Sequence, residues 1–140
     1  MCIRDSYTAV LGKAPRERRS NLVNKTLDVT ANIDDLKLDV GWFQVGNLEL
    51  EIWEYLNPAP IPAAEARPLE ALGHNMIVFD VSDPAVALNR LEDAGGLRVA
   101  APSAMDGGQI AFGRDPDGNL IGFFRPGSDG SAFSTHGLVY

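Results

Sequence analysis

Histidine and cysteine are scarce in this chain, and long apolar runs are absent. The 140 residues contain one cysteine, Cys2, and two histidines, His74 and His136. One cysteine excludes an internal disulfide and any structural zinc site built on paired thiolates. With only two histidines, a metal site would depend on carboxylates, which restricts the metal and its geometry. No segment approaches the roughly 20 apolar residues of a membrane-spanning helix, and no secretory signal opens the chain. The sequence therefore predicts a cytoplasmic protein with no membrane partner.

Basic residues are outnumbered by acidic ones. Twelve Lys and Arg against nineteen Asp and Glu give a net charge of -7 at pH 7. Because this balance repels phosphate backbones, we do not expect nucleic acid as a partner. Glu17 interrupts the one basic run, which we interpret as a solvated surface (Arg16, Arg18 and Arg19).

The second half of the chain carries the clearer pattern of elements. Residues 74–81 alternate as a strand, and one side of it is expected in the core (Ile77, Phe79 and Val81). Ser82 or Asp83 can then cap a helix that ends at Gly95. Its expected apolar stripe consists of Ala87, Leu88, Leu91 and Ala94. This segment predicts a strand followed by a helix.

Three further strands are predicted after that helix. They cover residues 97–101, 109–114 and 119–125, with turns at residues 106–108 and 115–118 between them. Strands that are joined by tight turns must be antiparallel. The second half thus predicts the order strand, helix and three strands.

The first half repeats this order in incomplete form. Residues 7–11 predict the end of a helix stopped by Gly12, and the expected strands cover residues 22–29, 36–45 and 48–55, with a turn at Gly46-Asn47 between the last two. The opening strand is lacking, and we interpret this as an incomplete gene model with non-native residues 1–6 rather than as a natural truncation. The gap would expose a sheet edge, which predicts either a homodimer or poor solubility.

A proline-rich segment separates the halves. Residues 58–72 contain four prolines and predict an extended linker between a truncated first module, residues 1–57, and a second module, residues 73–126. Both modules are expected to form one domain, which has the size and composition of an ordinary globular domain. Residues 127–140 are polar and glycine-rich, and they predict a loosely ordered tail.

Several sequence segments carry a resemblance to a known superfamily. The strongest are GHNMIVFDVSDPAVALNRLEDAGG and FGRDPDGNLIGFFRP, supported by YTAVLG and LELEIWEY in the first half. With the order of elements, they resemble the vicinal oxygen chelate superfamily, also called the glyoxalase/bleomycin resistance/dioxygenase superfamily. The resemblance implies an α+β fold in which two βαβββ modules curl mixed sheets around a cleft, here with the first module lacking its opening strand. It implies a fold and not a reaction.

The resemblance also implies where a divalent metal would be bound. Four ligands usually come from the first and fourth strand of each module, most often His or Gln first and Glu last. The first position falls in the missing strand, the second on Glu51, the third on Met76 and the fourth on Gly122. A thioether is a poor ligand for a hard divalent ion, and glycine has no side chain to donate. His74, one strand pleat or about 6.6 Å before Met76, is a weak ligand candidate.

Alternation along residues 48–55 predicts one core face and one polar, aromatic face. Leu48, Leu50 and Ile52 are expected in the core. The opposite face is either a solvated surface or a cleft lining, and its aromatic residues favour the cleft. In the second module, alternation with Gly122 directs Phe124 into the cleft and Phe123 into the core, unless both fill the core. The expected ligand-binding residues are Glu49, Glu51, Trp53, Tyr55, His74, Met76 and Phe124.

Three functions follow from this residue set. The leading hypothesis is a protein that binds a small organic molecule in the cleft without the usual metal or another cofactor, either with or without transforming it chemically. The alternative is a lyase, isomerase or dioxygenase with an atypical Mn, Fe, Zn or Ni site that includes Glu51 and His74. A second alternative is a non-catalytic, drug-sequestering protein whose acidic and aromatic residues attract a cation. The sequence names neither the ligand nor a catalytic residue.

Overall fold

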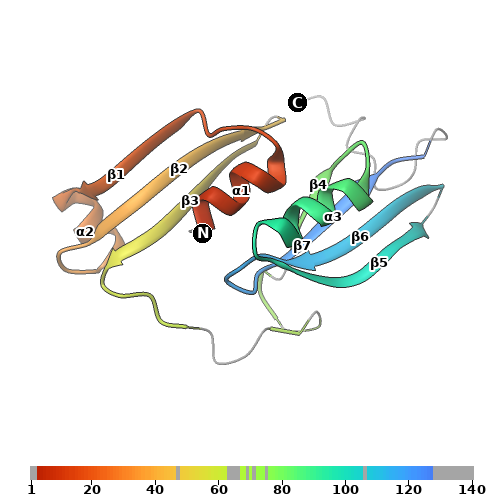
Figure 1. Cartoon of the computed structure of the whole chain (residues 1–140). Coiled ribbons are helices and arrows are strands. Elements are labelled where there is room, and N and C mark those ends of the chain that lie inside the picture. Colours follow the sequence, from red (N-terminus) through yellow and green to blue (C-terminus); the bar gives the residue numbers. More distant parts are fainter. Residues whose placement is uncertain are drawn as a thin grey trace. The chain divides into compact units, whose positions relative to one another are not determined.

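The computed structural model describes residues 3–46, 48–62, 67–68, 70, 72–74, 76–105 and 107–127. The chain forms two compact units, Met1–Ala64 and Glu65–Tyr140. The first unit combines two helices and the second unit one helix with a single β-sheet each, as expected for an α+β protein (Figure 1). Within the described residues, no helix is both long and apolar enough to cross a membrane. The predicted tail from residue 128 onward, His136, Asn47 and Asp106 lie outside the described residues.

The first unit has the element order α1 (Ile3–Leu11), β1 (Glu17–Val23), α2 (Lys25–Ala31), β2 (Lys37–Val45) and β3 (Leu48–Asn57). Its sheet order is β1-β2-β3, and both strand pairs are antiparallel. The predicted strands at residues 36–45 and 48–55 are confirmed. The helix end is confirmed too, since α1 stops before Gly12, which has a φ of 64°. No opening strand is present among the described residues of this unit.

Helix α1 packs on one face of the three-stranded sheet (Figure 1). Arg18 of β1 marks this face, since its guanidinium donates to the Asp5 carboxylate at 3.1 Å and to the Thr8 hydroxyl at 3.0 Å, both on α1. Because successive strand residues point to opposite faces, Arg19 lies on the other face. One face of the sheet is thus covered by α1, and the opposite face carries a different set of side chains.

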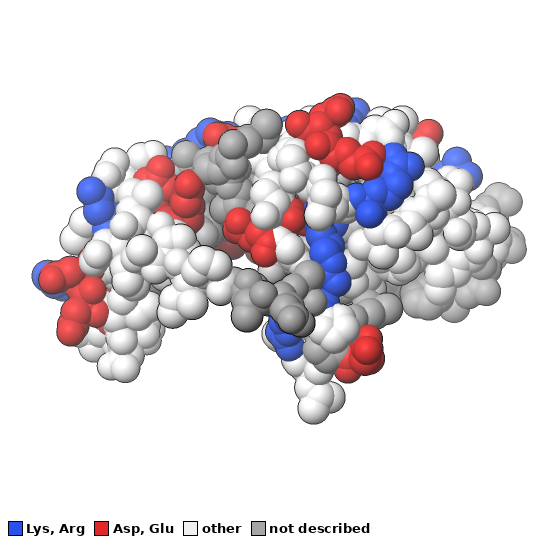
Figure 2. All heavy atoms as spheres, turned by 60° about the horizontal axis from the view of Figure 1, so that its bottom comes forward, with Lys and Arg blue, Asp and Glu red and all other residues white. Residues whose placement is uncertain are grey.

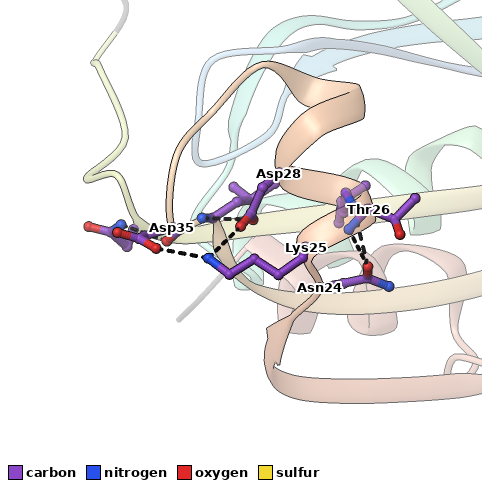
Figure 3. Close-up of polar contacts among 8 residues, drawn as sticks. Asn24, Lys25, Thr26, Asp28 and Asp35 are labelled. Carbon is purple, nitrogen blue, oxygen red and sulfur yellow. Dashed lines mark hydrogen bonds and ion pairs between the residues drawn. The ribbon is translucent and has the colours of Figure 1, made fainter.

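The predicted strand at residues 22–29 is wrong beyond Val23, because Asn24 begins helix α2. The Asn24 side chain accepts hydrogen bonds from the backbone N–H groups of Thr26 at 2.9 Å and Leu27 at 3.3 Å (Figure 3). This N-cap satisfies donors that a helix start leaves free, and a left-handed Asn32, with a φ of 53°, ends the helix. Strand β1 instead begins at Glu17, so it includes most of the basic run.

Ion pairs tie α2 to the chain that follows it. The Lys25 ammonium lies 3.2 Å from the carboxylate of Asp28 and 3.1 Å from that of Asp35 (Figure 3). The hydrogen bond to Asp35, and then that to Asp28, raise the pKa of Lys25 above its ordinary value. Asp28 is buried and also accepts the backbone N–H of Leu36 at 3.1 Å. This contact fixes the path of the chain into β2.

The second unit has the predicted order strand, helix and three strands. Its elements are β4 (Met76–Asp80), α3 (Pro84–Asp93), β5 (Leu97–Met105), β6 (Gly108–Arg114) and β7 (Leu120–Arg125). The sheet order is β4-β7-β6-β5 (Figure 1). Strand β4 is parallel to β7, whereas the other two pairs are antiparallel. This mixed sheet confirms the expected βαβββ module.

Helix α3 begins and ends at the predicted residues. The Asp83 side chain accepts from the backbone N–H groups of Ala85 at 2.8 Å and Val86 at 3.1 Å, and Gly95 follows the helix with a φ of 86°. The predicted apolar stripe is buried (Ala87, Leu88, Leu91 and Ala94). The helix lies so close to β6 that a Cβ atom at Gly113 would come 2.4 Å from Leu91 Cδ2. Gly113 is therefore a requirement of helix–sheet packing.

Core positions predicted by alternation are only partly confirmed. Phe79 is buried, but Ile77 is 39% exposed, because β4 is an edge strand with one neighbour. In the first unit, Leu48 is 54% exposed, while Leu50 and Ile52 are half-buried. These positions lie on an edge strand that the nine-residue α1 covers only in part. Phe43 of the central strand β2 is fully buried instead.

Candidate functional site

The strand register of the first unit brings acidic and aromatic side chains to the face opposite α1. Residues that are direct partners in an antiparallel ladder point to the same face. Trp42 is the partner of Glu17 on β1 and of Glu51 on β3, and Val40 is the partner of Arg19 and of Trp53. We call this side of the sheet the aromatic face, and its residues are Glu17, Arg19, Leu38, Val40, Trp42, Glu49, Glu51, Trp53 and Tyr55. Leu38 and Val40 on it are buried, and Leu27 and Ala31 of α2 pack against their cluster.

Two of the predicted site residues form an aromatic pair on this face. The ring centroids of Trp53 and Tyr55 lie 6.3 Å apart, with a tilt of 57° between the ring planes. Both side chains are half-buried and pack against the cluster of Leu36, Leu38 and Val40. This packing holds the rings in place while one part of each stays accessible.

Most charges of the aromatic face are already paired. Arg16 forms an ion pair with Glu49 at 2.6 Å, and Arg19 forms one with Glu17 at 2.7 Å. The Arg19 guanidinium also lies 5.8 Å from the ring centroid of Trp42, within range of a cation–π interaction. The basic run that we interpreted as solvated surface is exposed, but its arginines bind carboxylates of α1, β1 and β3.

Glu51 differs from the other carboxylates of this face. Its side chain is exposed and forms no hydrogen bond or ion pair within the described part of the chain. It lies between two indoles, with Trp42 as its cross-strand partner and Trp53 two residues along β3. Such a carboxylate, beside aromatic surface and without a basic partner, can accept a hydrogen bond from an added ligand.

The remaining predicted site residues lie in the second unit. His74 is exposed and precedes β4 rather than belonging to it, and its backbone carbonyl accepts a hydrogen bond from Arg67 at 3.5 Å. Met76 begins β4 and is 38% exposed. Phe123 and Phe124 are both 1% exposed, on opposite faces of β7. A Cβ atom at Gly108 would lie 3.1 Å from Phe124 Cε2, so this ring packs closely against the start of β6.

The turn between β6 and β7 is built from its own side chains. The buried Asp115 carboxylate accepts from the backbone N–H groups of Asp117 at 3.0 Å and Asn119 at 2.8 Å. Arg114 donates to the carbonyl oxygen of Gly118 and to that of Arg67, both at 2.7 Å. Through these contacts, Arg114, Asp115 and Asn119 fix the hairpin.

Fold and sequence together place the chain among known proteins. The family profile of the Glyoxalase/Bleomycin resistance protein/Dioxygenase superfamily matches residues 4–123. The chain belongs to this superfamily. No curated protein matches it. Among solved structures, a glyoxalase family protein from Bacillus cereus is similar with 20% identity, coverage of 80% of this chain and 76% of that one, and a TM-score of 0.67.

Two further crystal structures show the same glyoxalase-type fold. A glyoxalase-related enzyme from Fulvimarina pelagi has 21% identity, coverage of 90% of this chain and 83% of that one, and a TM-score of 0.55. A glyoxylase/bleomycin resistance protein/dioxygenase domain from Frankia sp. EAN1pec has 20% identity, coverage of 95% and 84%, and a TM-score of 0.57. At these identities the likeness establishes the fold alone.

The usual metal ligands of the glyoxalase superfamily do not fit the residues of this chain. At the fourth ligand position, a Cβ atom on Gly122 would lie 3.0 Å from Val78 Cγ2 and 3.3 Å from Phe112 Cε1. Gly122 itself offers no ligand, and a side chain there would require these apolar neighbours to shift by a few tenths of an ångström. Met76, at the third position, offers a thioether that suits soft metals rather than Mn²⁺ or Fe²⁺. No group of three or more His, Cys, Asp or Glu residues suited to a metal occurs in the described ranges.

Surface charge on the view of Figure 2 is mixed. Acidic and basic side chains are interspersed there, and neither sign forms a continuous field.

Two features of the aromatic face were missed from the sequence. Trp42 was not assigned to the site, although the turn predicted at Gly46-Asn47 implies a register that pairs Val45 with Leu48 and Trp42 with Glu51, as observed. The ion pairs of the arginines were also missed, because the edge strand β1 starts five residues before the predicted one. The hairpin register was the available signal for Trp42.

Proposed function

We propose that this glyoxalase-superfamily member binds a small organic molecule against the aromatic face of its first unit, without a divalent metal. The observation that carries the proposal is the placement of Glu51, exposed and unpaired in the described residues, between Trp42 and Trp53. Indole rings provide large apolar area with little loss of side-chain freedom. A carboxylate beside them orients a ligand through a charge-assisted hydrogen bond.

The lack of a fitting ligand set supports the metal-independent form of this proposal. The chemistry of Gly122 and Met76 removes two of the positions that superfamily members commonly use. The proposal assigns binding and no catalytic residue. A flat aromatic molecule complements the ring edges of Trp53 and Tyr55, which are held at a 57° tilt.

The alternative function is a metal-dependent lyase, isomerase or dioxygenase with an atypical metal site. It requires stoichiometric metal in the purified protein. A non-catalytic, sequestering protein is the second alternative, and it shares the metal-independent binding proposed here. Turnover of the bound molecule is what separates this alternative from an enzyme.

Tryptophan fluorescence offers a direct test, because the chain contains only two tryptophans and both lie on the aromatic face. The probes are phenylguanidine and phenylurea, each with ten non-hydrogen atoms, added to protein in EDTA. At about 0.4 kcal/mol per atom, such a probe binds with about 4 kcal/mol, or a Kd of about 1 mM. We expect saturable quenching in this range, and weaker quenching for Trp53→Phe.

Absence of saturable quenching by both probes would reject the proposed function. Quenching that appears only after Mn²⁺ or Zn²⁺ is added would favour the metal-dependent alternative instead. Leu97→Ala is a suitable control variant, because Leu97 lies on β5 of the second unit and is 68% exposed. Its titration should match that of the unchanged protein.

We also propose that the protein forms a homodimer through the outer edge of β3. Within the described ranges, β3 pairs with β2 alone, so its other edge has free backbone donors and acceptors. Edge strands of this kind readily pair with another chain unless charge, proline or bulges protect them. Light scattering on a size-exclusion column should give the mass of a dimer, and a monomer mass at all concentrations would reject this proposal.

A further inference from the structure

Trp42 lies between two glutamates, one on each neighbouring strand, and one of these glutamates already binds a cation. Its two cross-strand partners are Glu17 on β1 and Glu51 on β3. Direct cross-strand partners have Cβ atoms about 5 Å apart, so both carboxylates start beside the same indole. The central tryptophan therefore has two flanks of similar composition.

On the β1 flank, a guanidinium lies beside both the carboxylate and the indole. Arg19 donates from Nε to the Glu17 carboxylate at 2.7 Å and lies 5.8 Å from the centroid of the Trp42 ring. A cation in this position gains from the carboxylate charge and from the negative face of the ring. Within the chain itself, a glutamate beside Trp42 thus binds a guanidinium.

On the β3 flank, a carboxylate lies beside the indole without a cation. Glu51 forms no ion pair within the described residues, whereas Glu49, two residues earlier on the same face, is paired with Arg16. Trp53 adds a second indole about 6.6 Å along the strand from Glu51. This flank therefore has one carboxylate and two indoles, and lacks the positive charge that its counterpart contains.

We infer that the ligand of the aromatic face is an organic cation, of the guanidinium or alkylated ammonium class, held by Glu51 between Trp42 and Trp53. This inference rests on the proposed function, since it names the class of molecule bound at the same face. Net charge -7 favours the approach of such a ligand. On the opposite flank, Arg19 already supplies the cation that pairs with Glu17.

The test compares phenylguanidine with phenylurea, which has nearly the same shape and no charge. Binding is measured through the two tryptophans in EDTA. The unchanged protein should bind phenylguanidine about tenfold more tightly than phenylurea. Glu51→Gln should reduce this preference to twofold or less, because it keeps the shape of the side chain and removes its charge.

Glu54→Gln is the matched control. Glu54 lies on the same strand but opposite Asp39, on the face covered by α1, and its substitution changes net charge by the same amount. The tenfold preference should persist in this variant. Added salt should weaken the binding of phenylguanidine and leave phenylurea unchanged.

Three outcomes would overturn the inference. Equal binding of both probes by the unchanged protein rejects the cation but retains small-molecule binding at the face. Equal loss of preference in Glu51→Gln and Glu54→Gln assigns the effect to net charge and not to Glu51. Binding of neither probe rejects the inference together with the proposed function.

Discussion

Val78 and Gly122 are partners in the parallel β4–β7 ladder, and a Cβ atom on Gly122 would lie 3.0 Å from Val78 Cγ2. By its resemblance to the superfamily, this chain has Gly122 at the position where metal-binding members carry a glutamate. In this chain the position is filled by apolar packing against Val78 and Phe112. The residue present at this position therefore offers no side-chain ligand to a metal.

The first prediction concerns metal content. Purified protein should bind Mn²⁺, Fe²⁺, Zn²⁺ and Ni²⁺ weakly, because affinity depends on the number and type of ligands. Met76→His combined with Gly122→Glu restores two oxygen or nitrogen ligands and should strengthen binding by at least tenfold, as measured by calorimetry and elemental analysis. Stoichiometric metal in the unchanged protein, lost in His74→Ala, would contradict this account.

The second prediction concerns helix–sheet packing in the second unit. Gly113→Ala should lower the free energy of unfolding by about 2 kcal/mol, because its Cβ atom meets Leu91 Cδ2 at 2.4 Å and the Leu97 carbonyl oxygen at 3.0 Å. Gly122→Ala should cost less, since its nearest neighbour is a side chain of the edge strand β4. Urea unfolding measures both. Equal losses in the two variants would show that the sheet adapts to the added methyl group.

The third prediction concerns the cap of α2. Asn24→Ala should destabilise the protein by about 1 kcal/mol, because the N–H groups of Thr26 and Leu27 lose their acceptor. Thr26→Ala is the control, since only the backbone N–H of Thr26 takes part in the cap. Thermal unfolding should separate the two variants. A destabilisation of the same size in Thr26→Ala would argue against the cap.

The fourth prediction concerns acid stability. The hydrogen bond from Arg98 lowers the pKa of Glu92 below its ordinary value of 4.5, and the same contact raises that of Arg98. A carboxylate with a lowered pKa contributes stability above its unfolded pKa and loses it as pH falls through the folded pKa. Glu92→Gln should therefore have a lower free energy of unfolding than the unchanged protein at pH 7. This difference should disappear as pH falls below about 4.5.

The difference in free energy of unfolding between the two proteins should also decrease in high salt, because this ion pair is exposed at the surface. Glu70→Gln serves as the control, since Glu70 is exposed and belongs to no ion pair of the described residues. Urea unfolding at a series of pH values gives the required curves. Parallel curves for the unchanged protein and Glu92→Gln would show that the pair contributes nothing.

Local signals made the second unit predictable from sequence. Asp83 and Gly95 mark the two ends of α3, and the hydrogen bonds of Asp115 lie within five residues of chain. Such signals act over short range and do not depend on distant packing. The strand, the helix and the last hairpin could therefore be assigned with their main-chain directions.

The first unit was harder, because one segment satisfies two patterns. Leu22 to Val29 contains apolar residues that suit a strand, and only the capping side chain of Asn24 turns residues 25–31 into a helix. Burial of Asp28 then depends on the N–H of Leu36, eight residues along the chain, which no short-range pattern reveals. The aromatic face was assigned for Glu51 and Trp53 by alternation, whereas Trp42 required the register of the neighbouring strand.

The most direct measurement of the central claim is a nuclear magnetic resonance titration of the two indole N–H signals in EDTA. Phenylguanidine should shift the signals of both Trp42 and Trp53 with one common Kd, and Glu51→Gln should weaken that Kd while Glu54→Gln leaves it unchanged. The result that would contradict the account is a pair of signals that stay fixed in the metal-free protein and move only after Mn²⁺ or Zn²⁺ has been added.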